Sequence, residues 1–198
     1  MKRKFELNNK FVILFVGRVA PAKGLNYLIK AINEIKHLPI VTLIVGPLRY
    51  MFGEKEEFSS YTRNLFRLVE KYDLQKKIIF TDAVLRKDLP KYYSCADVFV
   101  LPSIYEAIPM VCVEAMAAGK PVIGSKIGGI QEIIRDGENG FLFETKNYKD
   151  LAEKLINIME DENQRKGMCI KSRKIAKNEF SWEVIGSKIF EVYKKCMK

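Results

Sequence analysis

Two glutamates, Glu106 and Glu114, stand eight positions apart at a predicted boundary between a loop and a helix. Pro109 suits the first position of a helix, because its fixed φ and missing N–H cost nothing there. We therefore expect a helix from Pro109 to Ala118, with Glu106 in the preceding loop and Glu114 about one and a half turns into the helix. A carboxylate accepts two hydrogen bonds at once, which suits the vicinal hydroxyls of a sugar. The pair predicts a site that holds a hydroxylated ligand.

The alternative is that both glutamates are ordinary solvated charges. Against it, the flanks of Glu114 make the predicted helix apolar nearly all round, through Val111, Val113, Ala115, Met116 and Ala117. A glutamate on such a helix needs a hydrogen-bonding partner or a water-filled cleft. We favour the ligand-holding interpretation.

Two cations lie in a glycine-bounded stretch from Gly17 to Gly24 that precedes another predicted helix. Arg18 can grip phosphate oxygens through paired N–H groups, and Lys23 adds a charge at the positive end of the helix. A diphosphate suits this arrangement, although a simple turn with two exposed cations fits the stretch equally well. The stretch has neither the Walker lysine pattern nor G-x-G-x-x-G, so a P-loop NTPase or a typical dinucleotide-binding protein is not supported.

Further candidate ligand contacts are main-chain groups at predicted helix starts. Gly128 and Gly129 expose bare N–H groups that could approach a sugar or phosphate, or they serve a turn that needs an unusual φ. The loop after Glu106 offers main-chain donors from Ile108, Met110 and Val111.

Short apolar, β-branched runs alternate with helical stretches, which is typical of βαβ units and a parallel sheet. The predicted strands are Val12 to Val16, Ile40 to Val45, Lys77 to Phe80, Asp97 to Leu101, Pro121 to Gly124 and Gly140 to Phe143. The predicted helices are Lys23 to Lys36, Ser60 to Lys71, Arg86 to Ser94, Pro109 to Ala118, Gly129 to Arg135, Asn147 to Met159, Glu162 to Lys177 and Trp182 to Cys196. We expect a long loop over Pro47 to Ser59.

Right-handed crossovers place such helices on both faces of one sheet. The prediction is therefore an α/β, doubly wound, Rossmann-like parallel sheet of about six strands with a helical C-terminal tail. Ligands bind such sheets beyond the carboxyl ends of the strands. Gly17-Arg18, Gly46-Pro47, Asp82, Ser103 to Glu106 and Ser125 to Gly129 each follow a predicted strand, so they are expected on one rim of the sheet.

Composition excludes several classes of protein. The chain has 198 residues, enough for one domain with a hydrophobic core, and its apolar runs fall well short of the ~20 residues of a membrane-spanning helix. The N-terminus lacks the apolar run of a secretory signal, so we expect a cytoplasmic protein. The four cysteines are scattered and His37 is the single histidine, so neither a metal site nor a disulfide framework is expected.

The formal net charge of +10 is concentrated toward the end of the chain. Nucleic acid, an anionic membrane surface and phosphorylated substrates are all compatible with this charge, and so is a solvated helical face that binds nothing.

Together the motifs resemble the C-terminal, donor-binding domain of retaining glycosyltransferases of family 4, also called group 1, which have the GT-B fold. The resemblance runs from about Phe11 to Tyr193. It is carried by Val16-Gly17-Arg18 through Lys23-Gly24, Leu43 to Pro47, Leu89-Pro90-Lys91-Tyr92-Tyr93, Ala96 to Ser103, Glu106 to Glu114, Ala117 to Val122, Gly128-Gly129 with Glu132, and Asn139-Gly140-Phe141-Leu142.

This resemblance implies that a nucleotide diphosphate sugar lies across the rim as donor substrate, with no cofactor required, no obligatory metal and no nucleic acid as partner. Arg18 and Lys23 would hold the diphosphate and neutralise the departing phosphate. Glu106 would contact sugar hydroxyls and Glu114 the ribose diol. The transfer would be front-face, with retention at the anomeric carbon and no enzyme nucleophile from this domain. Further donor contacts are implied at Gly17, Val84, Ile108, Met110, Val111, Gly128 and Gly129.

Three departures from the family pattern stand out. Ala107 and Pro109 occupy positions where glycine is common, and Asp82 stands where a glycine often follows the third strand, beside the expected base pocket. The third concerns domains: we expect residues 1–198 to form a single donor-binding domain, without the N-terminal Rossmann-like half that binds acceptor. Acceptor binding would then need that domain or a partner subunit, and the chain alone would transfer little sugar.

Two other functions stay open. One is a noncatalytic nucleotide-sugar-binding or interaction module of a split enzyme. The other is a nucleotide-sugar epimerase of GT-B fold, which the transferase-like glutamate motif disfavours. The basic tail suggests, in addition, peripheral contact with an anionic membrane.

Overall fold

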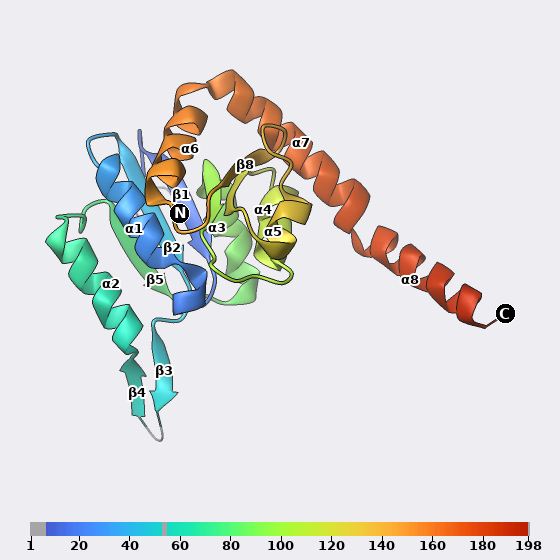
Figure 1. Cartoon of the computed structure of the whole chain (residues 1–198), viewed down its shortest axis with the longest axis horizontal. Coiled ribbons are helices and arrows are strands. Elements are labelled where there is room, and N and C mark those ends of the chain that lie inside the picture. The colour runs from blue at the N-terminus through green and yellow to red at the C-terminus, as the bar shows by residue number, and fades with distance from the viewer. Residues whose placement is uncertain (1–6, 53–54, 198) are drawn as a thin grey trace.

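The computed structural model describes residues 7–52 and 55–197 and contains one six-stranded parallel sheet (Figure 1). The four central strands of this sheet are buried almost throughout, as expected where helices cover both faces, and the two edge strands are buried only in part. The fold class predicted from the sequence is confirmed. The strands, in the spatial order β5-β2-β1-β6-β7-β8, are β5 (Ile78–Asp82), β2 (Ile40–Val45), β1 (Phe11–Val16), β6 (Val98–Leu101), β7 (Val122–Ser125) and β8 (Gly140–Phe143).

Helices form a layer on each face of this sheet. Contacts of α1 with α2 and α6 define one layer, and contacts of α4 with α5 and α7 the other. The helices are α1 (Leu25–Glu34), α2 (Ser60–Lys71), α3 (Leu89–Cys95), α4 (Met110–Ala117), α5 (Gly128–Ile133), α6 (Tyr148–Glu160), α7 (Glu162–Phe180) and α8 (Trp182–Cys196). Two 3-10 turns, Pro21–Lys23 and Arg86–Asp88, precede α1 and α3.

The strand order reverses between β1 and β6. The chain moves from β1 through α1 to β2 on one side, and from β6 through α4 to β7 on the other. The loops that follow β1 and β6 therefore diverge, and such a switch point is where open α/β sheets place their ligands. Lys23 follows β1 and Glu106 follows β6, so both lie at this point.

Side-chain caps explain where several helices begin. The side chains of Ser59, Asn147, Asp161 and Ser181 each accept a hydrogen bond from a main-chain N–H in the first turn of α2, α6, α7 and α8. Pro109 differs from its predicted place by one residue: it is the N-cap of α4, and its carbonyl accepts from Cys112 N at 2.8 Å.

The loop predicted over Pro47 to Ser59 is wrong, because this segment contains a hairpin. β3 (Arg49–Phe52) pairs antiparallel with β4 (Lys55–Phe58). At the base of the hairpin the guanidinium of Arg49 lies 4.9 Å from the centroid of the Phe58 ring, and the two residues face each other in the register. This cation–π pair across the strands favours pairing over an open loop.

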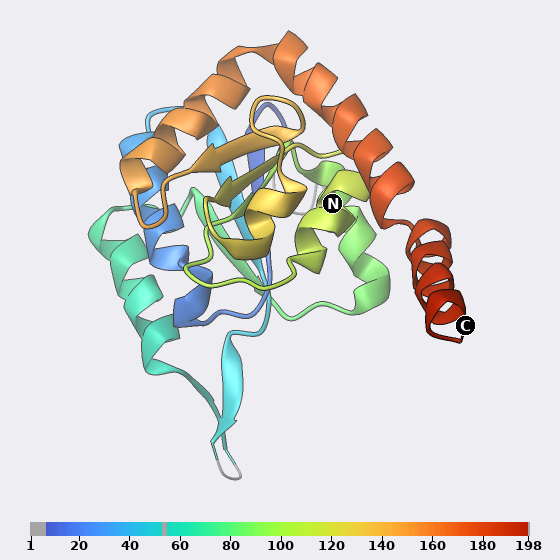
Figure 2. The same cartoon turned by 45° about the vertical axis from the view of Figure 1, so that its right-hand side comes forward.

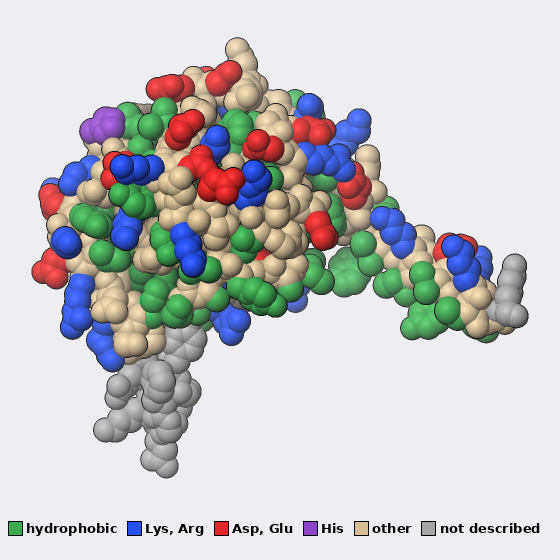
Figure 3. Space-filling view, in the orientation of Figure 1, with side chains coloured by type: hydrophobic (Ala, Val, Ile, Leu, Met, Phe, Trp, Pro, Cys, Tyr) green, Lys and Arg blue, Asp and Glu red, His purple; other side chains and the backbone are tan. Residues whose placement is uncertain are grey.

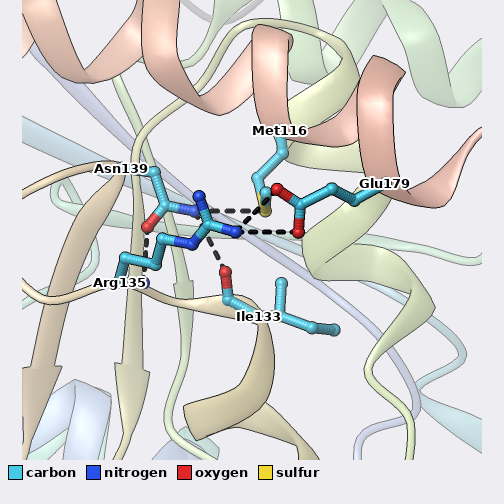
Figure 4. A network of polar contacts seen from close by, with 5 residues as sticks. All are labelled: Met116, Ile133, Arg135, Asn139 and Glu179. Carbon is cyan, nitrogen blue, oxygen red and sulfur yellow. Dashed lines mark hydrogen bonds and ion pairs between the residues drawn. The ribbon is translucent and has the colours of Figure 1, made fainter.

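A buried asparagine joins the elements that surround the glutamate motif (Figure 4). The side-chain oxygen of Asn139 accepts from Arg135 N at 2.7 Å, and its amide donates to Ile133 O at 3.0 Å and to Met116 Sδ at 3.6 Å. Arg135 in turn makes a paired contact with Glu179 of α7, at 2.6 and 2.8 Å. The network ties the end of α5 and the start of β8 to α4 and α7.

The last two helices differ in how they are packed. α7 lies against α4 and buries Met168, Ser172, Ile175 and Ala176. α8 projects away from the sheet and has no buried residue (Figures 1 and 2). Green apolar side chains line one side of α8 in Figure 3, and the strongly exposed ones are Trp182, Ile189, Phe190, Val192 and Tyr193. Over residues 7–52 and 55–197, no helix combines the length and the apolar character that crossing a bilayer requires.

Candidate functional site

An ion pair crosses the switch point of the sheet. Lys23 Nζ contacts Glu106 Oε2, and the two side chains are only 17% and 13% exposed. A main-chain hydrogen bond from Ile104 N to Ala22 O, at 2.8 Å, joins the same two loops. The predicted cation and carboxylate are thus brought together, each held by the other.

Two buried serines support Glu106 from beneath. Ser103 Oγ donates to Glu106 Oε2 at 3.2 Å, and Ser125 Oγ donates to the carbonyl oxygen of Ser103. In the described part of the chain, the donors recorded on the Glu106 carboxylate all contact Oε2. This fixes the carboxylate while Oε1 keeps its capacity to accept a hydrogen bond from a ligand.

Glu114 has the partner that its apolar helix requires. Tyr93 of α3 donates its hydroxyl proton to Glu114 Oε2 at 2.8 Å. Burial raises the pKa of Tyr93, and the neighbouring charge of Glu114 raises it further, so the hydroxyl remains a donor at neutral pH. Sequence reasoning missed Tyr93, although it lies in the Leu89 to Tyr93 stretch that carried the family resemblance.

Cys112 is fully buried behind the motif. Burial raises the pKa of its thiol, the charge of Glu106 raises it further, and Lys23 opposes the shift. The thiol therefore stays protonated at neutral pH and is no nucleophile. Cys95 is also buried.

A cavity of about 250 Å³ opens beside Arg18 at the carboxyl ends of β1 and β2. Its wall is predominantly apolar, and Arg18 itself is solvent-exposed. Three predicted site residues, Gly17, Arg18 and Val84, meet here, whereas Glu106 and Glu114 lie outside its lining. The full lining is Val16, Gly17, Arg18, Val45, Gly46, Pro47, Ala83, Val84 and Leu89.

Asp82 shapes the loop beside this cavity. Its φ of 63° lies in the left-handed region, which favours glycine, and this explains why glycine suits this position. The Asp82 carboxylate accepts from Ala83 N at 2.7 Å and from Leu48 N at 3.1 Å. Asp82 therefore binds the main chain on both sides of the cavity mouth, a role that the sequence did not suggest.

Gly128 and Gly129 allow α5 to lie against the motif loop. A Cβ on Gly128, whose φ is +35°, would stand 2.6 Å from Glu106 O, and one on Gly129 would stand 1.9 Å from Ala107 O. The close approach of α5 to the main chain of the motif loop leaves no room for a Cβ at either position, so both glycines are required whether or not they contact a ligand.

The remaining predicted contacts lie on the motif loop itself. Ile108 and Met110 are exposed, and Val111 is half-buried. Met110 N donates to Ile108 O at 3.0 Å, so this main-chain donor already has an acceptor within the loop. Among the described residues, no group of three or more His, Cys, Asp or Glu side chains is placed to hold a metal ion.

The sequence pattern of the family described as "Glycosyl transferases group 1" matches residues 1–175. The chain belongs to this family. A curated relative, spore coat protein SA of Bacillus subtilis, is 32% identical over 200 residues, covering 98% of the chain and 52% of the relative. The chain spans about half the length of the curated relatives it matches.

Solved structures share the fold of this group 1 glycosyltransferase chain. Sucrose-phosphate synthase from Thermosynechococcus elongatus matches with a TM-score of 0.87 and 28% identity, over 99% of this chain and 48% of that one. Anabaena HepE, in a crystal structure with UDP and glucose, matches with a TM-score of 0.88 and 27% identity, over 98% of this chain and 51% of that one.

Proposed function

We propose that this chain is the donor-binding domain of a retaining, hexosyl-type glycosyltransferase and binds a nucleotide diphosphate sugar across the switch point. The observation that carries the proposal is the Lys23–Glu106 ion pair, placed where ligands enter such sheets in a group 1 family member. The cavity of about 250 Å³ beside Arg18 is assigned to part of the nucleotide.

In this proposal each predicted residue has a distinct task. Arg18 and Lys23 bind the diphosphate and stabilise its charge as it departs, which is a large catalytic contribution when the cations are held in place beforehand. Glu106 keeps Lys23 at the switch point and accepts a hydrogen bond from the transferred sugar. Glu114 binds the ribose diol. Further donor contacts are assigned to Gly17, Val84, Ile108, Met110, Val111, Gly128 and Gly129.

The chemistry proposed is front-face transfer with retention at the anomeric carbon, as the family resemblance implies. The bond between the anomeric carbon and the diphosphate oxygen breaks while the acceptor hydroxyl oxygen bonds to the anomeric carbon on the same face, and the hydroxyl proton passes to the oxygen of the departing nucleoside diphosphate. No nucleophile from this domain takes part, in keeping with a Cys112 thiol that stays protonated. The donor is a substrate, and the proposal invokes no cofactor and no metal.

A titration with nucleotide sugars tests the donor site. Isothermal calorimetry with UDP-glucose and GDP-mannose should detect binding to the whole chain. Glu114→Gln and Arg18→Ala should each weaken it about tenfold, because each removes a charge-assisted hydrogen bond. Arg173→Ala on α7, an exposed arginine far along the chain, is the matched control and should bind like the parent. Unchanged affinity in both site variants would overturn the site assignment.

Acceptor binding is assigned to a second domain or a partner subunit, supported by two observations. The matched relatives are about twice as long as the chain, and α8 presents an uncovered apolar side. A noncatalytic nucleotide-sugar-binding module is the second candidate, on the same observations. Sugar transfer in the presence of the N-terminal half of a relative, with none by the chain alone, would favour the enzyme.

We further propose that the basic C-terminal helices meet an anionic membrane from the cytoplasmic side. Support comes from lysines flanking the apolar side of α8, Lys188, Lys194 and Lys195, which would lie near lipid phosphates. Co-sedimentation with vesicles of anionic lipid, compared with neutral vesicles, is the measurement. Equal recovery with both would contradict this contact.

A further inference from the structure

Tyr93 connects the two halves of the proposed donor site. It lies on α3, a short helix whose first residue, Leu89, lines the cavity beside Arg18. Tyr93 is four positions later on the same helix, so the two side chains lie on one face. The Tyr93 hydroxyl reaches Glu114 Oε2 at 2.8 Å and Val111 O at 3.5 Å, both on α4.

Burial and ring packing hold the Tyr93 side chain in place, so its hydroxyl has one defined position. Tyr93 is 3% exposed, and its ring packs against Phe99 of β6 with centroids 5.9 Å apart. Glu114, by contrast, is only partly buried and has three side-chain torsions that would otherwise rotate freely. A buried hydroxyl must bond to a partner, so the Tyr93–Glu114 contact holds the carboxylate in one orientation.

The orientation leaves Glu114 suited to a vicinal diol. The recorded contact to its carboxylate, within residues 7–52 and 55–197, involves Oε2 alone. A carboxylate has about four acceptor positions, so a ribose can still bond both of its hydroxyls to Glu114. A 2′-deoxyribose offers only one hydroxyl and leaves part of the oriented charge without a donor.

We propose that Tyr93 is a positioning residue that orients Glu114 and thereby makes the site selective for ribonucleotides over 2′-deoxyribonucleotides. The inference rests on the proposed function, since it assumes that Glu114 meets the ribose. Leu89 would place the nucleoside and Tyr93 would aim the carboxylate, so α3 couples the cavity to the ribose contact. Tyr93 touches neither the diphosphate nor the sugar in this scheme.

The test compares UDP with 2′-deoxy-UDP by calorimetry on the full chain. The parent should bind UDP about tenfold more tightly than 2′-deoxy-UDP, as expected for a hydrogen bond to a charged group. Tyr93→Phe keeps the ring and should weaken the binding of UDP more than that of 2′-deoxy-UDP, which has one hydroxyl fewer for Glu114 to hold, so the ratio should fall toward one. Tyr61→Phe is the matched control: its half-buried hydroxyl bonds to Asn26 at 3.3 Å, away from the motif, and the ratio should stay at the parent value.

A double variant separates positioning from mere support of the fold. Once Glu114→Gln is present, adding Tyr93→Phe should change UDP affinity no further, because Tyr93 acts through Glu114. A parent that binds neither these two nucleotides nor UDP-glucose or GDP-mannose overturns the proposed function and this inference with it. The inference alone is overturned if the parent discriminates between the two nucleotides and the Tyr93→Phe variant keeps the same ratio. It is also overturned if the effects of Tyr93→Phe and Glu114→Gln on UDP affinity are additive in the double variant.

Discussion

Cys112 gives the motif a measurable dependence on pH. Burial raises the pKa of its thiol above the ordinary value of 9.0. Above about pH 9 the unfolded chain therefore loses a proton that the folded chain keeps, and the free energy of unfolding falls by up to about 1.4 kcal/mol per pH unit from this group. Below about pH 9 both states hold the proton and the contribution is flat. Urea unfolding between about pH 8 and about pH 10 measures the slope.

The variants that isolate this thiol are Cys112→Ala and Cys196→Ala. Cys112→Ala should show a shallower loss of stability with rising pH, whatever its stability at neutral pH. Cys196, exposed near the end of α8, serves as control, and its variant should keep the slope of the parent. Identical slopes for the parent and Cys112→Ala would contradict the assignment.

At the residue scale, the sequence predicts which groups matter better than it predicts their partners. Spacing and apolar flanks predicted that Glu114 needs a partner. They could not identify Tyr93, which lies 21 positions earlier and reaches Glu114 only because α3 packs against β6. Likewise, Gly128 and Gly129 were recognised as special, but their close approach to the motif loop depends on tertiary packing.

At the scale of elements, we expect Asn139 to contribute more to the stability of the fold around the motif than Arg135 does. Asn139→Ala removes two hydrogen bonds to the main chain of α5 and its following turn, and it leaves the buried Ile133 O and the part-buried Arg135 N without these partners. We expect a loss of about 2–3 kcal/mol in the free energy of unfolding. Arg135→Ala removes the ion pair with Glu179. Because the Arg135 and Glu179 side chains are 46% and 39% exposed, this variant should lower the free energy of unfolding by less than about 1 kcal/mol. Urea unfolding of both variants checks the order, and a reversed order would contradict it.

Elements with a strong pattern were predicted well, and the one without was missed. β2 and β6 were found because buried parallel strands are continuous apolar runs. Several helix ends shifted by one to three residues; at Lys23 and at Arg86, for example, a 3-10 turn precedes the α-helix. β3 and β4 pair with each other in a two-stranded sheet outside the main sheet. The alternation of strands and helices that predicts the main sheet therefore gives no signal for this hairpin.

On the scale of the whole molecule, the packing predicts which C-terminal segment the fold requires. α7 packs against α4, the helix that carries Glu114, and buries apolar side chains there, including Met168 and Ile175. α8 buries none of its residues, and the family match ends at residue 175. The basic charge and the last helix of the chain were predicted from the sequence, but the separation of this helix from the core depends on where α7 ends.

Two truncations test this division. A chain ending after Ser181 lacks α8 and should keep its thermal unfolding midpoint within a few degrees, together with its affinity for UDP, because no buried contact is removed. A chain ending after Glu160 also lacks α7, and the exposed core face should cost about 5 kcal/mol or more, enough to unfold many domains. Circular dichroism melts and UDP calorimetry measure both. A large loss of stability on removing α8 alone would show that this helix packs against the domain in solution, and would argue against a face kept for a second domain or a membrane.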